Sequence, residues 1–526
     1  MDTLPEQFAA APKTVRPRKP KPVHYPVIGV ADGQAITEDG EVLTIDELTN
    51  RLPTMPVTML VANMAARLLA DLDHAYATTT VGWQYRVSNN EREITTPTGE
   101  RFATRVTIAV SYFGWKNRAF HKLLDPITMY GRSLDVIAPG DQPRAQRLLQ
   151  WGIQLRDFCY QQGIDPRPTI GAMARQLLTD PRFYPEPRRK VPMATNATAR
   201  EHLPGNHYRV FVDLKDQEYT GLYLDQTSAH HYHAMHTDMP HSDHLYAYGR
   251  FVDLAEICFT RLPERFYGLY CLDLEWQHGA KYSWLPYPEN GKLEKQFVYS
   301  NELPHLQDMG YRVTGIRAAW GSPFKDDGIK RYAKWARETV AQHDNPKWLK
   351  LLLLSAYGTL ATAPRAAEFV FKDAKRGTPV SLPTGGRPLP GLQTKGSKKL
   401  EPGICNVLQR GMIEAATRSE SIGYAQALDA QGHKILAIYA DAVIIQDDGA
   451  NTLPPTIEPW RLKTRLNHLQ FLNSQAFIAG EMARLPGYSG GVRQKTLRAH
   501  APRLTPNVAA IMETEENAEA LLRPTH

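Results

Sequence analysis

The stretch KWLKLLLLSAYG, residues 347–358, has the spacing of a helix with one charged and aromatic face. Lys350, Leu354 and Tyr357 stand at positions i, i+4 and i+7, so they share a face of that helix. The preceding segment, residues 324–342, carries apolar residues at helical spacing and ends at the turn HDNP. The pattern therefore predicts two antiparallel helices, the second of which presents a lysine.

Two aspartates follow strand-like segments on either side of this helix pair. Asp225 comes at the end of TGLYLDQTS, residues 220–228, and Asp441 lies within KILAIYADAVIIQDD, residues 434–448. The second segment has the pattern of a β-hairpin with its turn at or just after Asp441. Two carboxylates at strand ends can hold divalent metal, and a facing cationic helix can hold a triphosphate. This combination predicts two-metal nucleotidyl transfer, and it predicts that Asp225 and Asp441 meet in the fold.

The three motifs resemble those of the polymerase half of family B DNA polymerases, especially the protein-primed subfamily of phages and linear plasmids. The family's first motif is D-x-x-S-L-Y-P-S, and residues 225–232 are D-Q-T-S-A-H-H-Y. The second is K-x-x-x-N-S-x-Y-G, and residues 350–358 are K-L-L-L-L-S-A-Y-G. The third is Y-x-D-T-D-S, and residues 439–444 are Y-A-D-A-V-I. The resemblance covers about residues 205–450.

The resemblance implies a role for each matching residue. Asp225 and Asp441 would be catalytic and would bind Mg²⁺ or Mn²⁺. The implied nucleotide-binding residues are Ser228, His230, Arg337, Lys350, Tyr357 and Gly358, and Tyr439 would support the hairpin motif. In the family, His230 is a tyrosine that excludes ribonucleotides, the residue at Tyr357 packs against the nascent base pair, and Gly358 lets the template base approach. The implied partners are template-primer DNA, deoxynucleotides and a priming (terminal) protein.

Val443 departs from the family because it stands where the principal metal-binding aspartate is expected. Asp441 and Val443 are two residues apart and would share a strand face, so a small slip of the turn could exchange them. An aspartate at position 443 would then be tolerated. Alternatively, the protein is polymerase-derived and binds nucleic acid with impaired catalysis. His230 adds a third alternative, a ribonucleotide-tolerant or primase-like polymerase.

The N-terminal part resembles the family's 3′–5′ exonuclease domain without its acidic motifs. PVIGVADGQAI, residues 26–36, contains no D-x-E, and the segment that starts at Asn63 keeps the asparagine of N-x-x-x-D but loses the aspartate. The helical segment 147–161 contains no Y-x-x-x-D. Because two-metal hydrolysis needs carboxylate ligands, the sequence predicts a protein without proofreading.

Two clusters leave alternatives open. Residues 374–400 contain basic side chains and no acid, either as a solvated loop or as a contact to DNA backbone or to a priming protein. The basic residues are Lys375, Arg376, Arg387, Lys395, Lys398 and Lys399. Six of the 18 histidines lie between residues 230 and 244. They form either a polar segment beside the polymerase site or a metal site built on His231, His233 and His236.

Composition adds weaker constraints. The chain has 526 residues, a net charge of +7 and 42% hydrophobic residues, as expected of a multidomain globular protein with a weak preference for polyanions. Four widely spaced cysteines indicate neither a disulfide framework nor a zinc site. No signal peptide or membrane-spanning run is present, so we expect a protein of the bacterial or archaeal cytoplasm, not secreted and without a membrane partner.

We therefore expect an α+β multidomain fold, a right-hand polymerase preceded by a degenerate exonuclease-like α/β domain. The expected parts are a basic flexible tail (1–25), the exonuclease-like domain (26–200), the first part of the palm (201–322), fingers (323–363), a basic insertion loop (364–403), the second part of the palm (404–460), and thumb with a C-terminal tail (461–526). The expected function is template-directed DNA synthesis in the replication of a phage or linear mobile element.

Overall fold

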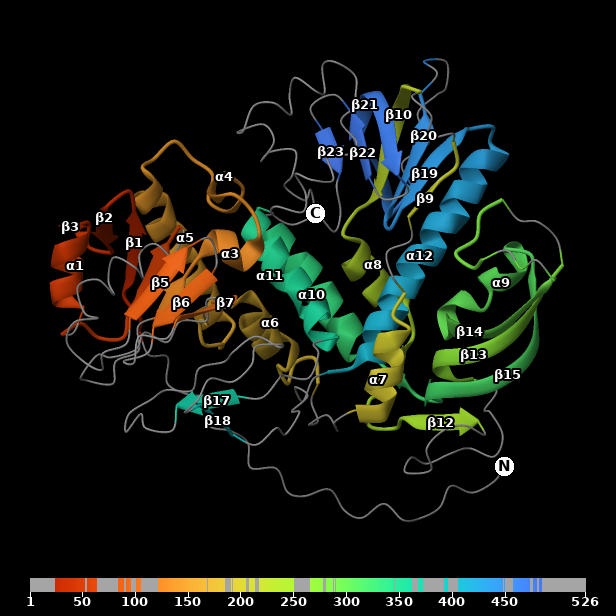
Figure 1. The fold of residues 1–526 in the computed structure, drawn as a ribbon, viewed down its shortest axis with the longest axis horizontal. Coiled ribbons are helices and arrows are strands. Elements are labelled where there is room, and N and C mark those ends of the chain that lie inside the picture. Colours follow the sequence, from red (N-terminus) through yellow and green to blue (C-terminus); the bar gives the residue numbers. More distant parts are fainter. Residues whose placement is uncertain are drawn as a thin grey trace, which may run out of the picture. The chain divides into compact units, whose positions relative to one another are not determined.

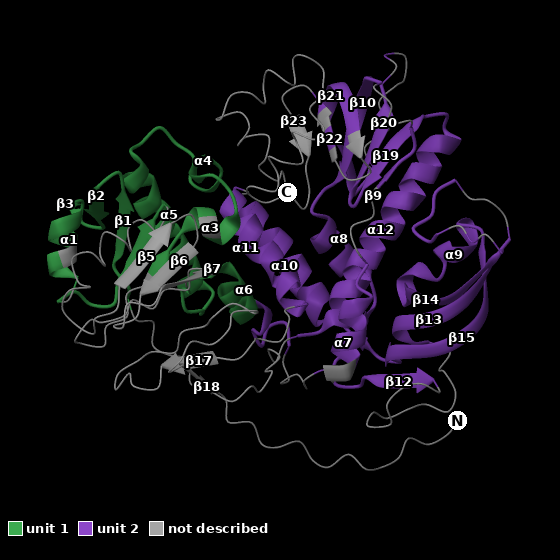
Figure 2. Ribbon diagram, viewed as in Figure 1, with its two compact units in different colours: residues 1–177, 366–397 green, residues 178–365, 398–526 purple. Residues whose placement is uncertain are grey.

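The computed structural model describes most of residues 24–63, 84–105, 122–361, 368–371, 392–395 and 405–484. The chain divides into two compact units, unit 1 with residues 1–177 and 366–397 and unit 2 with residues 178–365 and 398–526 (Figure 2). Both contain helices and sheets (Figure 1). Among the helices of the described ranges, none has the length and apolar character needed to cross a membrane.

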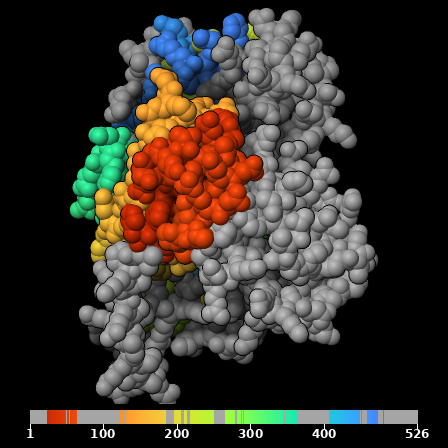
Figure 3. Space-filling view, turned by 90° about the vertical axis from the view of Figure 1, so that its left-hand side faces the viewer, coloured from red at the N-terminus to blue at the C-terminus, as the bar shows by residue number. Residues whose placement is uncertain are grey.

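Unit 1 is built on a five-stranded mixed sheet in the order β3-β2-β1-β4-β8. The strands are β1 (Val27–Ala31), β2 (Gln34–Thr37), β3 (Val42–Thr44), β4 (Met59–Ala62) and β8 (Lys122–Leu124). β1, β4 and β8 are parallel, whereas β2 and β3 form antiparallel hairpins. Helix α1 (Ile45–Arg51) starts at Thr44, which forms a capping box with Glu47. This N-terminal segment forms the red surface in Figure 3.

Helix α5 (Arg144–Gln161) lies directly against β1 at Gly29. Ile28 and Val30 point into the core on the other face of the sheet, so position 29 faces the helix. A Cβ atom at Gly29 would lie 2.1 Å from the carbonyl oxygen of Ala145 and 2.6 Å from the main-chain nitrogen of Leu149. The helix backbone therefore takes the space that any side chain at position 29 would need.

The remaining described elements of unit 1 are short. β5 (Gln84–Ser88), β6 (Glu91–Thr95) and β7 (Arg101–Arg105) form an antiparallel sheet, and β17 (Glu368–Phe371) pairs with β18 (Leu392–Lys395). The short helices are α3 (Pro126–Tyr130), α4 (Leu134–Ile137) and α6 (Ile170–Leu178).

Unit 2 contains a seven-stranded antiparallel sheet in the order β23-β22-β21-β10-β20-β19-β9. Its strands are β9 (Tyr208–Val210), β10 (Tyr219–Gln226), β19 (Ile435–Tyr439), β20 (Ala442–Gln446), β21 (Trp460–Asn473), β22 (Ala476–Ala479) and β23 (Met482–Arg484). β10 is central and pairs with β20 on one side and β21 on the other. The domain boundary expected at residue 461 falls inside β21, so the segment that follows it begins in this sheet.

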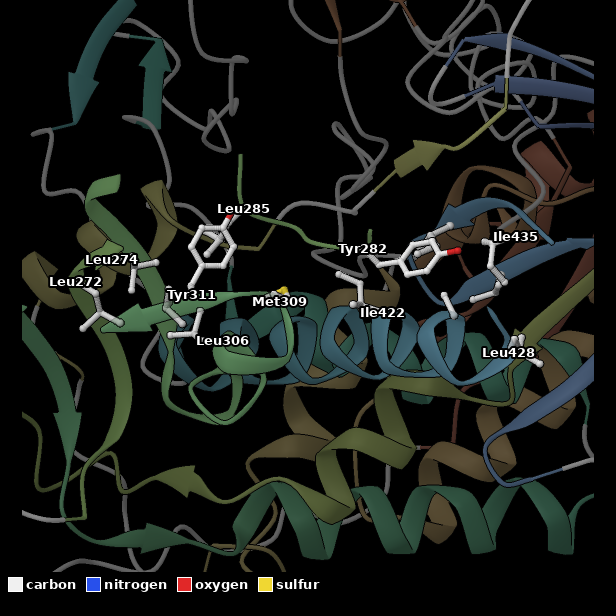
Figure 4. Packing of buried hydrophobic residues seen from close by; sticks show 14 of the residues in the cluster. Leu272, Leu274, Tyr282, Leu285, Leu306, Met309, Tyr311, Ile422, Leu428 and Ile435 are labelled. Atoms are coloured by element: carbon white, nitrogen blue, oxygen red, sulfur yellow. The ribbon is translucent and has the colours of Figure 1, made fainter. Parts of the chain in front are cut away.

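Helix α12 (Val407–Ala430) packs between the seven-stranded sheet and a second, four-stranded antiparallel sheet. The second sheet has the order β12-β15-β13-β14, with β12 (Tyr246–Gly249), β13 (Tyr267–Trp276), β14 (Lys292–Tyr299) and β15 (Tyr311–Ser322). Figure 4 shows their common core, in which Ile422 and Leu428 of α12 lie with Leu272 of β13 and Ile435 of β19. One continuous apolar core thus supports β10 and the β19–β20 hairpin on the face of the sheet that packs against α12.

Helices α8 (Ala229–His236), α10 (Gly328–Gln342) and α11 (Lys347–Leu360) stand beside the C-terminal end of β10 (Figure 1). The hydroxyl of Tyr332 on α10 donates a hydrogen bond to the carbonyl oxygen of Leu353 on α11, at 2.8 Å. Both helices were expected from the sequence, and both are confirmed. The other described elements of unit 2 are α7 (Met193–Glu201), α9 (His305–Asp308), η1 (Ser300–Glu302), and the short pair β11 (Met239–Pro240) and β16 (Lys325–Asp326).

Candidate functional site

Asp225 lies near the end of β10, between β20 and β21. Leu222 and Leu224 point into the core shared with α12, so Tyr223 and Asp225 point to the other face of the sheet. The Asp225 side chain is 11% exposed. A carboxylate that is almost completely buried needs a cationic partner, because an isolated buried charge is strongly unfavourable.

The β19–β20 hairpin turns at Ala440 and Asp441. Tyr439 pairs with Ala442 across the hairpin, which leaves two residues in the turn. Ala440 has φ 52°, in the left-handed region that L-residues seldom occupy. The hairpin and the position of its turn, both predicted from the sequence, are confirmed.

Asp441 lies beside Asp225 in this structure. Asp225 pairs with Ala442, and the main-chain N–H of Gln226 donates a hydrogen bond to the carbonyl oxygen of Asp441 at 2.9 Å. The two aspartates therefore occupy one end of two neighbouring strands, as the sequence predicted.

Val443 belongs to the opposite face of the sheet. It is completely buried and packs in the apolar core that includes Leu224 and Ile422. Asp441 sits in the turn, one residue beyond the strand that holds Val443. The expectation that the two positions could exchange, and that an aspartate would be tolerated at 443, is therefore wrong. A carboxylate at 443 would enter the core rather than join Asp225.

A chain of buried hydrogen bonds runs from α8 to the turn of the hairpin. The side-chain nitrogen of Gln226 donates to the Ser421 hydroxyl at 2.8 Å and to the Thr417 carbonyl at 3.3 Å. The Ser421 hydroxyl donates in turn to the Ala440 carbonyl at 2.7 Å. His233 Nε2 lies 2.6 Å from Gln226 Oε1. Gln226 thus fixes the turn of Asp441 through both its main chain and its side chain.

The partners of Gln226 settle the proton position on His233. Because the carbonyl of Thr417 can only accept, the Gln226 nitrogen faces it and the Gln226 oxygen faces His233. His233 Nε2 therefore carries the proton and donates. Burial, with a smaller contribution from His236, lowers the pKa of His233 to about 4. The imidazole is consequently neutral at pH 7.

Tyr357 of α11 is held by the histidines of α8. Its hydroxyl lies 2.7 Å from His231 Nδ1, and its ring stacks on His230 with 6.0 Å between centroids. Burial, followed by repulsion from Lys350 and Arg337, lowers the pKa of His231 to about 3. Tyr357 is completely buried. In this structure it packs against protein and offers no surface to a base pair, which differs from the role implied by the resemblance.

Lys350 projects from α11 into a cationic environment that also contains Asp225. Its pKa is lowered first by burial and then by the charges of Lys347 and Arg461, whereas Asp225 acts in the opposite direction. The predicted lysine and the predicted carboxylate therefore influence each other electrostatically. A half-buried ammonium of this kind can form charge-assisted hydrogen bonds to phosphate oxygens.

Two residues of β21 that the sequence analysis did not single out also belong to this site. Lys463 Nζ lies 3.2 Å from the Asp225 carboxylate, and Arg461 pairs with Asp225 in the strand register. The sequence signal for these two residues was weak, because basic residues at alternate positions are also typical of an ordinary strand that is exposed to solvent. An irregularity in the pairing of β21 hid the face on which Lys463 lies.

The other predicted nucleotide-binding residues lie nearby with different partners. Ser228 is the residue before α8 and has φ 53°. Arg337 of α10 forms an ion pair with Glu458 at 2.5 Å. Around Gly358 a Cβ atom would meet nothing within 4 Å, so this side of α11 is open. A phosphate would therefore have to compete with Glu458 for Arg337.

Tyr439 supports the hairpin from its core. It is completely buried and packs against Phe477 and Phe471, with ring centroids 5.4 and 6.4 Å away. Its role is to anchor the strand that leads into the turn.

The structure describes the histidine segment, but it describes only one of the six basic residues of the loop. Lys395 lies in β18, and the other five basic residues of the loop fall outside the described residues: Lys375, Arg376, Arg387, Lys398 and Lys399. His231, His233 and His236 each contact a different group, namely Tyr357, Gln226 and the Tyr232 carbonyl. They do not converge on a common metal position.

The acidic residues at the site suit a hard divalent cation. In the described part of the chain no group of three or more His, Cys, Asp or Glu side chains could hold a metal. Mg²⁺, however, is commonly bound through one or two carboxylates, with water and substrate phosphates completing its shell. The backbone places Asp225 and Asp441 at one strand end, and both are residues of the type that such a cation prefers.

Comparison with known proteins identifies the fold. The chain is similar to solved structures of phi29 DNA polymerase, with the alignment covering 87% of this chain and 87% of that one. The complex with primer-template DNA gives a TM-score of 0.56 at 12% sequence identity, and the complex with primer-template DNA and incoming nucleotides gives 0.55 at 14%. The complex with single-stranded DNA gives 0.54 at 14%.

No family model matches the sequence, and no curated protein matches it. At these identities the likeness concerns the fold, which is that of a DNA polymerase. The α+β multidomain polymerase fold expected from the three motifs is thereby confirmed.

Proposed function

We propose that this protein is a DNA-directed DNA polymerase that transfers nucleotides from deoxynucleoside triphosphates to a primer paired with a template. The observation that carries this proposal is the meeting of Asp225 and Asp441 at one strand end, with Lys350 in electrostatic range of Asp225. A polymerase fold supplies the context, but the chemistry is argued from these side chains. In this proposal the seven-stranded sheet is the palm, and α10 and α11 are the fingers.

Asp225 and Asp441 would hold Mg²⁺ or Mn²⁺, which when bound would activate the primer hydroxyl and neutralise the leaving pyrophosphate. Lys350, Lys463 and Arg461 would hold the triphosphate, because they surround Asp225 with positive charge. Gln226 would keep the turn of Asp441 in place. His230, whose ring stacks on that of Tyr357, is proposed to face the sugar of the nucleotide.

We further propose that the enzyme does not proofread. In unit 1 residue 29 is a glycine, and α5 occupies the space that any side chain at this position would need. No D-x-E motif stands on β1. A carboxylate pair facing α5 is therefore absent from this strand, and two-metal hydrolysis would lack its ligands. The purified protein should leave a mismatched 3′ end intact, in wild type and in Asp225→Ala alike.

The resemblance of the motifs to the protein-primed subfamily supports a role in replicating a phage or linear mobile element, with a terminal protein as primer. The basic segment around Lys395 would contact DNA or that protein. With DNA and deoxynucleotides as substrates, the protein would act in the cytoplasm of a bacterial or archaeal host.

Primer extension on a recessed 3′ end tests the proposal. Wild type, Asp225→Ala and Asp441→Asn are compared with Mg²⁺ and Mn²⁺ in parallel, and with dNTPs against NTPs. Extension by wild type and its loss in both variants is expected, with dNTPs preferred. Equal use of NTPs would favour the ribonucleotide-tolerant alternative. Extension that survives in both variants would contradict the assignment of the site.

A second function follows from Val443 and Lys463. The apolar core fills the side of the sheet on which Val443 lies, so this position offers no metal ligand. The ammonium of Lys463 already neutralises the charge of Asp225. If wild type binds primer-template but extends it with neither metal, the protein is a polymerase-derived nucleic-acid-binding protein.

A further inference from the structure

β21 contains one extra residue where it pairs with β10, the strand that carries Asp225. Tyr223 of β10 pairs with Thr464, and its neighbour Leu224 pairs with Leu462, so Lys463 has no partner in the register. This is a β-bulge, an arrangement that bends a strand and re-aims a side chain. Leu224 and Leu462 both face the core with α12. The extra residue therefore turns Lys463 to the face that carries Asp225.

The bulge gives Asp225 a cation of its own. Lys463 Nζ lies 3.2 Å from Asp225 Oδ2 and 5.2 Å from the centroid of the Tyr223 ring. The carboxylate is 11% exposed, whereas the lysine side chain is 44% exposed. The ammonium thus sits at the solvent side of the carboxylate, where an incoming metal ion would have to approach.

The surrounding charges favour an anion over a free metal ion. The charges of Lys347, Arg461 and Lys463 all act on Lys350, and Asp225 opposes them. A free divalent cation would meet this positive field and would have to displace the ammonium of Lys463. A nucleoside triphosphate would instead be attracted and would give Lys463 a new anionic partner.

We propose that Lys463 is a resident counter-ion of Asp225, which makes divalent-metal binding conditional on the nucleotide. Without nucleotide, Lys463 holds the carboxylate and metal binds weakly. With nucleotide, the triphosphate draws Lys463 away, and Asp225 becomes available to the metal that accompanies it. This inference rests on the proposed metal-binding role of Asp225 and adds an order of assembly to it.

Mn²⁺ binding to the full-length protein tests this order without any synthesis. The free Mn²⁺ signal in electron paramagnetic resonance is titrated with wild type and Lys463→Met, with and without a non-hydrolysable dNTP analogue. Lys463→Met should bind Mn²⁺ about two- to fivefold more tightly without nucleotide, the range expected for losing one partly exposed ion pair. The gain in affinity that the analogue gives should be smaller in Lys463→Met than in wild type.

Arg465→Met is the matched control. It removes an ion pair with Asp447 at 3.1 Å, two residues further along β21, and should leave Mn²⁺ affinity at the wild-type value. Asp225→Asn should abolish the effect of Lys463→Met. Thermal unfolding of each variant confirms that the proteins compared are folded.

Equal or weaker Mn²⁺ binding by folded Lys463→Met would overturn the inference, as would an equal gain in Arg465→Met. The proposed polymerase activity fails separately. A wild type that never extends primers, while Lys463→Met gains Mn²⁺ affinity, would refute synthesis and support the counter-ion. A wild type that extends primers, together with a Lys463→Met that shows no gain in Mn²⁺ affinity, would support synthesis and refute the counter-ion.

Discussion

The main-chain N–H of Gln226 donates a hydrogen bond to the carbonyl oxygen of Asp441 at 2.9 Å. This contact ties the residue after Asp225 to the hairpin turn, so the positions of the two aspartates are mechanically linked. The side chain of the same glutamine reaches the turn a second time through Ser421. The geometry of the site therefore depends on residues that carry no charge.

Asp441→Asn should lower the rate of primer extension by at least about a hundredfold, because it removes one of the two proposed anionic metal ligands and metal stabilisation amounts to several kcal/mol. Binding to primer-template, measured by fluorescence anisotropy, should stay within twofold of wild type. Asp447→Asn, which removes an acid of the same hairpin from its ion pair with Arg465, serves as the control. A comparable loss of synthesis in both variants would show that the effect is not specific to Asp441.

Val443→Asp should destabilise the protein by about 3–5 kcal/mol, since it would place an unpaired carboxylate in a completely buried position. Val443→Thr, which has nearly the same shape, should cost about 1–3 kcal/mol. Chemical denaturation followed by circular dichroism measures both. Wild-type stability of Val443→Asp would mean that this face of β20 opens to solvent.

Ser421→Ala should reduce kcat more than it raises the KM for nucleotide, because it leaves the Ala440 carbonyl without the hydroxyl that fixes the turn. The lost hydrogen bonds should also cost about 1–3 kcal/mol in the free energy of unfolding. Ser419 offers a matched control on the same helix, because its buried hydroxyl has no hydrogen-bond partner among the described residues. Ser419→Ala should be neutral in both measurements.

Stability should fall as the pH drops below about 6.5. The pKa values of His231 and His233 lie at about 3 and about 4 in the folded protein, so only the unfolded state takes up their protons in this window. Each histidine can contribute up to about 1.4 kcal/mol per pH unit, and the contribution is complete above the unfolded pKa. Urea denaturation between pH 7 and 5 should show a shallower dependence for His233→Gln than for wild type. An unchanged slope would indicate that His233 is accessible to protons.

Lys350→Ala should weaken the apparent affinity for nucleotide roughly ten- to a hundredfold, the equivalent of one charge-assisted contact worth about 1.5–3 kcal/mol. Template binding should change little. Lys347 lies one turn earlier on α11, is exposed, and provides the control. Single-turnover extension over a range of nucleotide concentrations separates the two effects. Equal losses in DNA and nucleotide binding would contradict the assignment.

The sequence predicted the elements of this site better than their contacts. The helix pair, the strand that ends in Asp225 and the turn at Asp441 were all predictable, because periodicity and turn chemistry are local. The meeting of the two aspartates followed from the order of the three motifs. The burial of Val443 was missed, since a two-residue spacing places two residues on one strand face only where both belong to the strand, and Asp441 lies in the turn.

The role of Lys463 was hidden for a related reason. A bulge changes the face of a side chain without leaving a mark in the hydrophobic pattern. The partners of Gln226, Ser421 and His233 come from three distant segments, so single-sequence reasoning offers no signal that joins them. Small polar residues within otherwise apolar helices and strands were the available hint.

The close approach of α5 to Gly29 has an evolutionary consequence. A single nucleotide change turns a glycine codon into an aspartate or a glutamate codon, depending on its third base, so a carboxylate on β1 is always one mutation away. Such a mutant would have to push aside the backbone at Ala145 and Leu149 before it could bind any ion. The substitution would therefore strain the packing of β1 against α5. The packing of this helix thus blocks the introduction of a carboxylate at this position of β1 by a single substitution.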